Sequence, residues 1–176
     1  MSGFPRFPAG FAVQAMQPAD VEAVLVVQAQ AYAGFDLLED AGFFLNRIEL
    51  SPRTCWIARG DGGLLGYLVS YPWTLGEPPE LNVPLRSLPA GARSWFLHDC
   101  AVAPAMAGRG VGRALVSAGL CHARTSGLAC ATLVSLGLAR PYWAAQGFEP
   151  VATDPGLLDA YGANACYMRR LLNAGR

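Results

Sequence analysis

The stretch "LHDCAVAPAMAGRGVGRALV", residues 97–116, decides the fold. It begins as an apolar, strand-like run, which ends where Pro104 cannot continue the pairing of a central strand. Three glycines, Gly108, Gly110 and Gly112, then alternate directly before an apolar run with helical spacing. The stretch therefore predicts a strand, a glycine turn and a helix, in that order.

A glycine turn at the start of a helix is suited to binding an anion. The amide hydrogens of the first helical turn lack partners within the helix, and the helix dipole adds partial positive charge. Glycines let a phosphate oxygen approach the backbone, and Arg109 and Arg113 offer charged contacts. A dinucleotide fingerprint (G-x-G-x-x-G) and an ATP-type loop (G-x-x-x-x-G-K-[ST]) are both absent. A phosphate site and a plain turn remain open from this segment alone.

Length and charge limit the function classes. The 176 residues are expected to form a single domain, residues 1–176, that can bury a core without disulfides or metal. Just over half of the residues are apolar, and 13 basic residues balance 13 acidic ones. Because phosphate backbones and anionic lipids attract a basic excess, this balance argues against nucleic acid or a membrane as the main partner.

The N-terminal segment and the cysteines indicate the compartment. The start "MSGFPRFPAG" lacks the basic and apolar regions of a signal peptide, and no apolar run is long enough to span a membrane, so a cytoplasmic protein is expected. The cysteines are odd in number and scattered in apolar surroundings, which predicts reduced core thiols: Cys55, Cys100, Cys121, Cys130 and Cys166. His98 and His122 are not spaced as zinc ligands, so no metal is expected.

Hydrophobic periodicity predicts the other elements. Helices are expected over residues 16–33, 37–52, 110–124 and 139–146. Strands are expected as a hairpin over residues 54–73 and as runs over residues 94–102, 128–136, 148–152 and 164–172. The four prolines of residues 74–93 indicate a long surface loop, of the kind that often forms a substrate wall. One sheet with helices makes this an α+β fold.

Three motifs resemble the Gcn5-related N-acetyltransferase superfamily. The stretch quoted first resembles its motif A, in which a strand ending in AV-x-P leads through R/Q-x-x-G-x-G/A into a helix. "ARPYWAAQGF", residues 139–148, resembles its C-terminal motif A-x-x-F-Y-x-x-x-G-F, and "LLGYLVS" matches its G-x-hydrophobic strand. The resemblance covers nearly the whole chain. It implies α/β/α layers, a mixed and mostly antiparallel sheet splayed at its middle strands, and helices on both faces.

The resemblance also implies acetyl-CoA as cosubstrate. Cys100, Ala101 and Val102 would end the strand whose free backbone pairs with the pantetheine arm, and a bulge near Pro104 would help to splay the sheet. The amide of Val102 would polarise the thioester carbonyl. The pyrophosphate would lie on the amides of Gly108, Arg109, Gly110, Val111, Gly112 and Arg113. Ala107 replaces the family's Arg or Gln, so binding should depend mainly on the backbone amides.

Transfer to an amine requires a base and benefits from an acid. His98 is expected on the same strand face as Val102 and is the candidate base, while Asp99 is expected on the opposite face, capping a loop or pairing with an arginine. The family's acidic tyrosine aligns with Trp143, which is expected to pack against the cofactor arm. Tyr142 is therefore the candidate acid, with Tyr161 or solvent as alternatives. Covalent catalysis by Cys100 is a minor alternative, because no histidine is obviously set to activate it.

The acceptor is expected to be a primary amine on a small molecule or a peptide. It would lie between the first two helices, the proline-rich loop and the last-strand loop, against aromatic and acidic side chains: Tyr32, Phe35, Asp36, Glu39, Phe43, Tyr71, Trp73, Glu77 and Glu80. A homodimer is possible. The alternative function is a non-catalytic acyl-CoA-binding or regulatory module, which the tryptophan in place of tyrosine favours.

Overall fold

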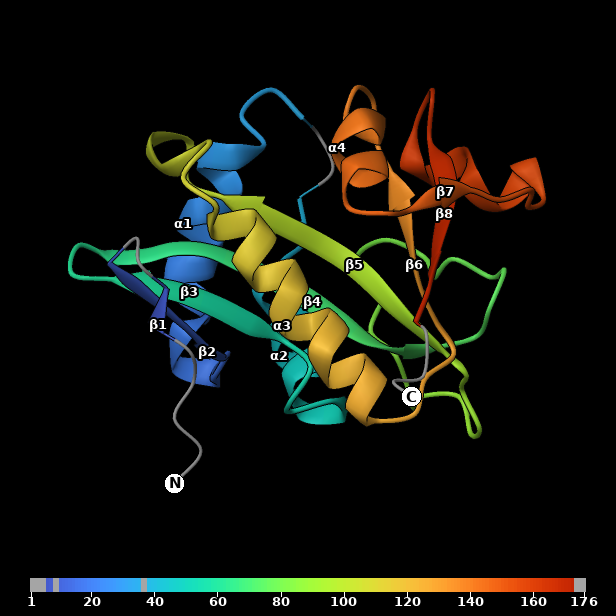
Figure 1. Cartoon of the computed structure of the whole chain (residues 1–176), viewed down its shortest axis with the longest axis horizontal. Helices are drawn as coiled ribbons and strands as arrows, with labels where there is room; N and C mark the ends of the chain where they lie inside the picture. The colour runs from blue at the N-terminus through green and yellow to red at the C-terminus, as the bar shows by residue number, and fades with distance from the viewer. Residues whose placement is uncertain (1–5, 8–9, 36–37, 173–176) are drawn as a thin grey trace.

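The structure is a computed structural model that describes residues 6–7, 10–35 and 38–172. Within these residues the strands form one eight-stranded sheet in the order β1-β2-β3-β4-β5-β6-β8-β7 (Figure 1). All neighbouring strands pair antiparallel except β5 and β6, which are parallel. The strands are β1 Arg6–Phe7, β2 Phe11–Ala15, β3 Trp56–Gly60, β4 Gly63–Trp73, β5 Ser94–Val102, β6 Cys130–Ser135, β7 Glu149–Pro150 and β8 Cys166–Leu171. The predicted α+β fold with a mixed, mostly antiparallel sheet is confirmed.

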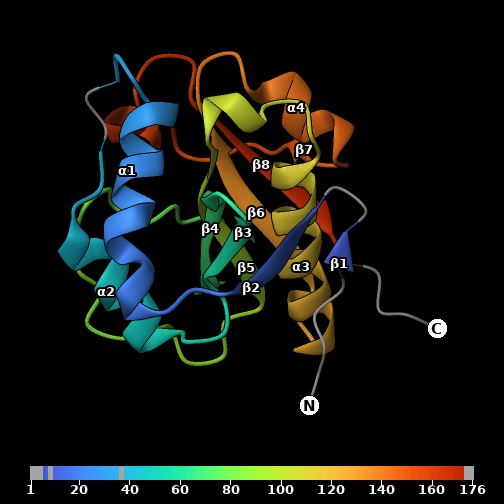
Figure 2. The ribbon, with the colours of Figure 1, turned by 90° about the vertical axis from the view of Figure 1, so that its left-hand side faces the viewer.

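Helices cover both faces of the sheet, as predicted (Figure 2). The first pair, α1 Val21–Ala31 and α2 Ala41–Leu50, covers one face, and α3 Val111–Thr125 with α4 Arg140–Ala145 covers the other. Each face has its own apolar core. Short 3-10 turns lie at η1 Pro18–Asp20, η2 Pro104–Met106 and η3 Pro155–Tyr161. No helix of the described residues is long and apolar enough to cross a membrane.

Two strands were missing from the prediction, and one is shorter than predicted. The five residues of β2 pair with β3 along their whole length and bury Phe11 and Val13. The apolar Ala12 between them hides the alternation that marks a half-buried strand. The expected strand over 148–152 is reduced to the two residues of β7.

The sheet opens between β5 and β6. These two strands pair only from Ser94 to Leu97 on the β5 side, so the β5 edge beyond Leu97 has no neighbouring strand. Residues 98–100 are accordingly only half-buried. The predicted splay of the middle strands is confirmed, and it begins at His98.

A β-bulge lies at the same point. Against β4, Asp99 pairs with Val69 and Leu97 pairs with Ser70, so His98 is one extra residue in β5. The prediction of a bulge near Pro104 is wrong. Pro104 lies beyond the end of β5, in the turn η2, where there is no ladder to interrupt.

The bulge changes which side chains share a face. The ring centroid of His98 lies 4.7 Å from that of Phe43 on α2, and Asp99 accepts a hydrogen bond from Tyr32 at the end of α1. Val102 instead packs against the core beneath α3. Two predictions are therefore wrong: His98 does not share a face with Val102, and Asp99 does not point away from His98. The extra residue shifts the period-2 alternation by one.

Gly119 sets the distance between α3 and the sheet. A Cβ at this position would lie 2.4 Å from the indole ring of Trp95, which is fully buried in β5. We predict that Gly119→Ala lowers the free energy of unfolding by about 1–3 kcal/mol, because two rigid elements must move apart. Urea unfolding measures this loss. The control is Gly62→Ala, whose Cβ would meet nothing within 4 Å and should change the stability little; equal stability of both variants would contradict this packing.

Candidate functional site

The glycine segment forms a turn of bare backbone at the start of α3. Gly108 and Gly110 have φ values of 73° and 80°, a left-handed conformation that glycine adopts without strain. Five amides have no hydrogen-bond partner among the described residues, those of Gly108, Gly110, Val111, Gly112 and Arg113, whereas the Ala114 amide donates to the carbonyl of Gly110. The amide of Arg109, however, donates to the carbonyl of Met106 at 3.2 Å. The prediction that the Arg109 amide is free for phosphate is therefore wrong.

A cavity of about 550 Å³ lies over these amides. Its lining includes Gly108, Gly110, Val111, Gly112, Arg113 and, at one end, Cys100, Val102 and Tyr142. A Cβ on Gly112 would fall 2.8 Å from the hydroxyl oxygen of Tyr142, so glycine is what lets this hydroxyl approach the helix. Ala107 also lines the cavity, whereas Arg109 does not.

A second cavity, of about 380 Å³, fills the opening between β5 and β6. Cys100 and Tyr142 line both cavities, so the two meet at these residues. Trp143 lines the second cavity while its ring packs on Phe148, with centroids 5.8 Å apart. Ala101 faces the core beneath α1 and lines neither cavity. Tyr142, Trp143 and Cys100 thus lie together along this cavity.

The backbone of β5 points alternate amides into the opening. The amide of Ala103 donates to the carbonyl of Leu65 on β4, at 2.8 Å. Because successive amides of a strand point to opposite edges, the amides of Val102 and Cys100 face the open edge. An extended chain lying in the opening would find these two donors free of β4.

His98 lies at the floor of the second cavity with both ring nitrogens bonded. Its Nε2 is 2.7 Å from Oε1 of Glu39, and its Nδ1 is 2.7 Å from the hydroxyl of Tyr71. The side chain is only 2% exposed. A neutral imidazole satisfies both contacts, with Tyr71 donating to Nδ1 and Nε2–H donating to the carboxylate. His98 therefore has no free nitrogen for a substrate.

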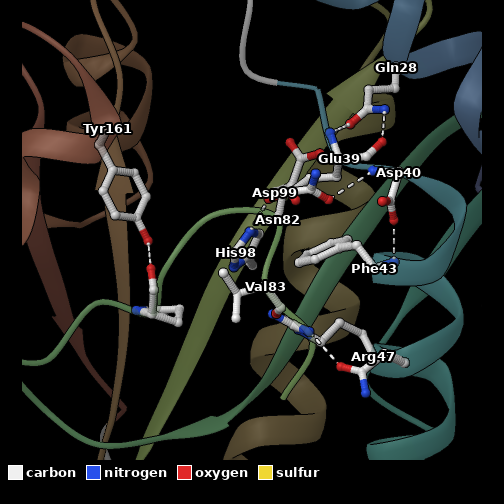
Figure 3. Close-up of polar contacts among 12 residues, drawn as sticks. Gln28, Glu39, Asp40, Phe43, Arg47, Asn82, Val83, His98, Asp99 and Tyr161 are labelled. Carbon is white, nitrogen blue, oxygen red and sulfur yellow. Dashed lines mark hydrogen bonds and ion pairs between the residues drawn. The ribbon is translucent and has the colours of Figure 1, made fainter.

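Glu39, one of the residues expected around the acceptor, contacts His98, which the sequence did not reveal. The side-chain amide of Gln28 holds its backbone twice, donating to the carbonyl at 2.8 Å and accepting from the amide at 3.0 Å (Figure 3). Oε1 meets His98, while Oε2 is buried without a hydrogen-bond partner. Gln28 is itself buried on the apolar side of α1, and a polar side chain at such a position was the available signal.

Asp99 lies beside this pair, between two tyrosines. Tyr32 donates to Oδ1 at 2.5 Å and Tyr67 donates to Oδ2 at 2.6 Å. The prediction that Asp99 caps a loop or pairs with an arginine is therefore wrong. Burial raises the pKa of the Asp99 carboxyl, and the two hydroxyl donors hold the pKa lower than burial alone would. Burial, and then the Asp99 charge, raises the pKa of both tyrosines. These two hydrogen bonds join the end of α1 to β4 and β5 at the centre of the sheet.

Comparison with known proteins identifies the family. A family model described as the acetyltransferase (GNAT) family matches residues 23–148. This chain belongs to the GNAT family. A mycothiol acetyltransferase of Frankia alni is 37% identical over 139 residues, which cover 73% of this chain and 39% of that protein. The chain therefore spans well under half the length of that relative.

Solved structures share the fold of this GNAT chain. Ard1 from Thermoplasma volcanium superposes with a TM-score of 0.70 at 18% identity, over 93% of this chain and 98% of that one. An N-acetylglutamate synthase from Neisseria gonorrhoeae, complexed with coenzyme A and N-acetyl-glutamate, gives a TM-score of 0.70 at 18% identity, over 93% of this chain and 35% of that one.

Three of the predicted acceptor residues line the second cavity of this GNAT chain: Tyr32, Phe35 and Glu39. Phe43 and Tyr71 are buried beneath His98 and support it instead. Trp73 at the end of β4, with Glu77 and Glu80 in the proline-rich loop, is not part of the lining, and Asp36 lies outside the described residues. Tyr161 lines the cavity, but its hydroxyl donates to the carbonyl of Pro79, so its proton is already committed.

All five cysteines are free thiols. The prediction that all of them lie in the core is wrong for one. Cys121 is exposed on α3, because it lies on the outer face of that helix. Burial raises the pKa of Cys55 to about 12, and burial together with the Asp99 charge raises the pKa of Cys100. Cys100 is thus a protonated thiol at neutral pH, which disfavours covalent catalysis through it.

We predict that iodoacetamide at neutral pH modifies Cys121 first and leaves Cys55 and Cys100 largely unmodified. The reason is that only the thiolate reacts, and raised pKa values keep the thiols of Cys55 and Cys100 protonated until the pH is well above neutral. Peptide mass spectrometry over time measures the order. Alkylation of Cys100 as fast as that of Cys121 would contradict the assigned protonation state.

Proposed function

We propose that this chain transfers an acetyl group from acetyl-CoA to a primary amine, by direct attack in a complex that holds both substrates. The observation that carries the proposal is the meeting of the two cavities at Cys100 and Tyr142. One cavity offers free amides and a helix N-terminus to a pyrophosphate, and the other is a mostly apolar hollow that reaches His98 and Glu39. A thioester at the junction would be open to attack from the second cavity.

The residues present fit acetyl-CoA as a substrate. The amides of Gly108, Gly110, Val111, Gly112 and Arg113 would bind the pyrophosphate, and the absent side chain of Gly112 leaves room beside Tyr142. The pantetheine arm would lie along the open edge of β5, as an added strand pairs with a sheet edge. The Val102 amide would then donate to the thioester oxygen and stabilise the charge that develops there. A fold relative complexed with coenzyme A supports this assignment.

The transfer needs no acyl-enzyme intermediate. The amine nitrogen forms a bond to the thioester carbon, the carbon–sulfur bond breaks, and the nitrogen loses a proton to a base in the second cavity. Tyr142 is the proposed acid for the leaving sulfur, because its hydroxyl lies at the junction and burial raises its pKa, so that it is protonated at neutral pH. Solvent then restores the Tyr142 proton.

The direct test is release of free thiol from acetyl-CoA in the presence of a panel of primary amines. The chain contains no lysine, so acetylated lysine of the enzyme itself cannot account for the signal. Thiol release that depends on an added amine, with the N-acetyl product seen by mass spectrometry, is the expected result. Tight CoA binding with no transfer to any amine or peptide would favour the alternative of a binding module, which the buried Trp143 at the family's tyrosine position suggests.

We predict that Tyr142→Phe lowers kcat by about 10- to 100-fold while the Kd for CoA stays nearly unchanged. The substitution removes only the proton donor and keeps the ring that lines the cavities. Steady-state kinetics and calorimetry measure the two quantities. A kcat equal to that of the unaltered chain would remove Tyr142 from the mechanism and leave protonation to solvent.

We also predict that Arg113→Ala weakens CoA binding by about 3- to 10-fold, and that the loss shrinks as salt is added. Arg113 is exposed on the first turn of α3 and lines the glycine cavity, where its charge would contact phosphate. Arg124, exposed on the last turn of the same helix, lies outside this cavity, and Arg124→Ala is the matched control. Equal Kd values for the two variants would overturn the assignment.

A further inference from the structure

Glu39 presents one unsatisfied oxygen to the second cavity. Its side chain is 7% exposed and lines the cavity, Oε1 is held by His98, and Oε2 has no partner. A buried carboxylate oxygen without a donor costs free energy, because water no longer solvates it. The double contact from Gln28 fixes the backbone at this position, and the contact with His98 holds the carboxylate at the cavity wall.

The charges around Glu39 favour a cation. Asp99 lines the same cavity, and none of its described lining residues is a lysine or an arginine. The other titratable groups that face Glu39 are His98 on β5, Tyr71 on β4, Tyr32 at the end of α1 and Tyr161 in η3. The guanidinium of Arg47 on α2 packs on Tyr71, with its carbon 5.3 Å from the ring centroid, and donates to Val83 instead.

We propose that Oε2 of Glu39 binds the ammonium group of the acceptor and removes its proton, and that His98 and Tyr71 are positioning residues for this carboxylate. The inference rests on the proposed function and names the base that it requires. It also replaces His98, both of whose ring nitrogens are bonded, as the group that touches the substrate. An ammonium group would supply the hydrogen-bond donor that Oε2 lacks.

The walls of the cavity define the rest of the acceptor. The lining is predominantly apolar, and its mouth carries Phe35 and Leu138, which are 54% and 97% exposed. Exposed apolar side chains at the opening of a cavity are suited to contact the apolar part of a ligand. The acceptor class is therefore a primary ammonium on an apolar or aryl body, whose far end leaves the cavity between these two residues.

The proton balance is complete. The ammonium donates to Oε2, one N–H bond breaks and one O–H bond forms, and the neutral amine keeps the lone pair that attacks the thioester. Glu39 becomes a neutral carboxylic acid while the Nε2–H of His98 still bonds Oε1. Once bonded to the thioester carbon, the nitrogen loses a second proton to solvent, which balances the proton that Tyr142 gives to the leaving sulfur and regains from solvent. After transfer Glu39 returns its own proton to solvent as the product leaves, so the net release is one proton per amide formed.

The first test is binding, which does not depend on turnover. With CoA present at neutral pH, 2-phenylethylamine is compared with the neutral 2-phenylethanol by NMR titration. We expect the ammonium to bind the unaltered chain about 10-fold or more tightly than the alcohol, and Glu39→Gln to abolish this preference. Glu49→Gln, on the exposed end of α2, is the matched control and should keep it. The proposal would be overturned if Glu39→Gln kept the same preference for the ammonium as the unaltered chain, or if the unaltered chain did not bind the amine.

The second test is the pH profile of acetyl transfer from acetyl-CoA to 2-phenylethylamine. The unaltered chain should show kcat/KM nearly flat above neutral pH. Glu39→Gln should lose about 100-fold or more at neutral pH and recover steadily toward pH 10, because only amine that is already deprotonated can then react. His98→Gln should lose less, about 10-fold, with a profile of intermediate slope. Circular dichroism confirms that the variants are folded.

The outcomes separate the two proposals. If the unaltered chain transfers no acetyl group yet binds the ammonium through Glu39, the proposed reaction fails while the ammonium site stands. If transfer occurs but Glu39→Gln keeps both the rate and the flat profile, the reaction stands and the assignment of Glu39 as its base is overturned.

Discussion

The β-bulge at His98, an extra residue of β5 that has no pairing partner in β4, is the feature on which the rest of the site depends. The bulge begins where the pairing of β5 with β6 ends, so one local irregularity coincides with the opening of the sheet. It also brings His98 and Asp99 to the face covered by α1 and α2, while Cys100 and Val102 stay toward α3. The same strand thereby presents side chains to an acceptor and backbone amides to an acyl donor.

Burial of carboxylates is the second constraint on this site. Two tyrosine hydroxyls donate hydrogen bonds to Asp99 and one histidine nitrogen contacts Glu39, but no described arginine pairs with either carboxylate. Both residues are held by contacts from segments that are distant in the sequence. The site therefore forms only when α1, the loop before α2 and the central strands are all folded. Charge left uncompensated in a small apolar cavity is suited to an ammonium ligand, since binding would supply the missing counter-charge.

Local sequence signals predicted the elements well and the site only in part. The bounds of β5 agree with the predicted strand 94–102, because the prolines and glycines that follow it are signals read within a few residues. The bulge at His98 could not be read in the same way, since it depends on how β5 matches β4, about 30 residues earlier in the chain. Glu39 acquires its role only when Gln28 and His98 meet it in the fold. The buried glutamine on an apolar helix face was the one local indication.

The most direct test of the open β5 edge is amide hydrogen exchange of residues 98–103 and 110–113, measured by NMR with and without saturating CoA. The amides of Cys100 and Val102 face the opening, whereas that of Ala103 is bonded to β4. CoA is expected to slow exchange at Cys100 and Val102 and at Gly110 to Arg113, and to leave exchange at Ala103 unchanged. Unchanged exchange at Cys100 and Val102 in the CoA complex would contradict the claim that the bulge opens β5 for the acyl donor.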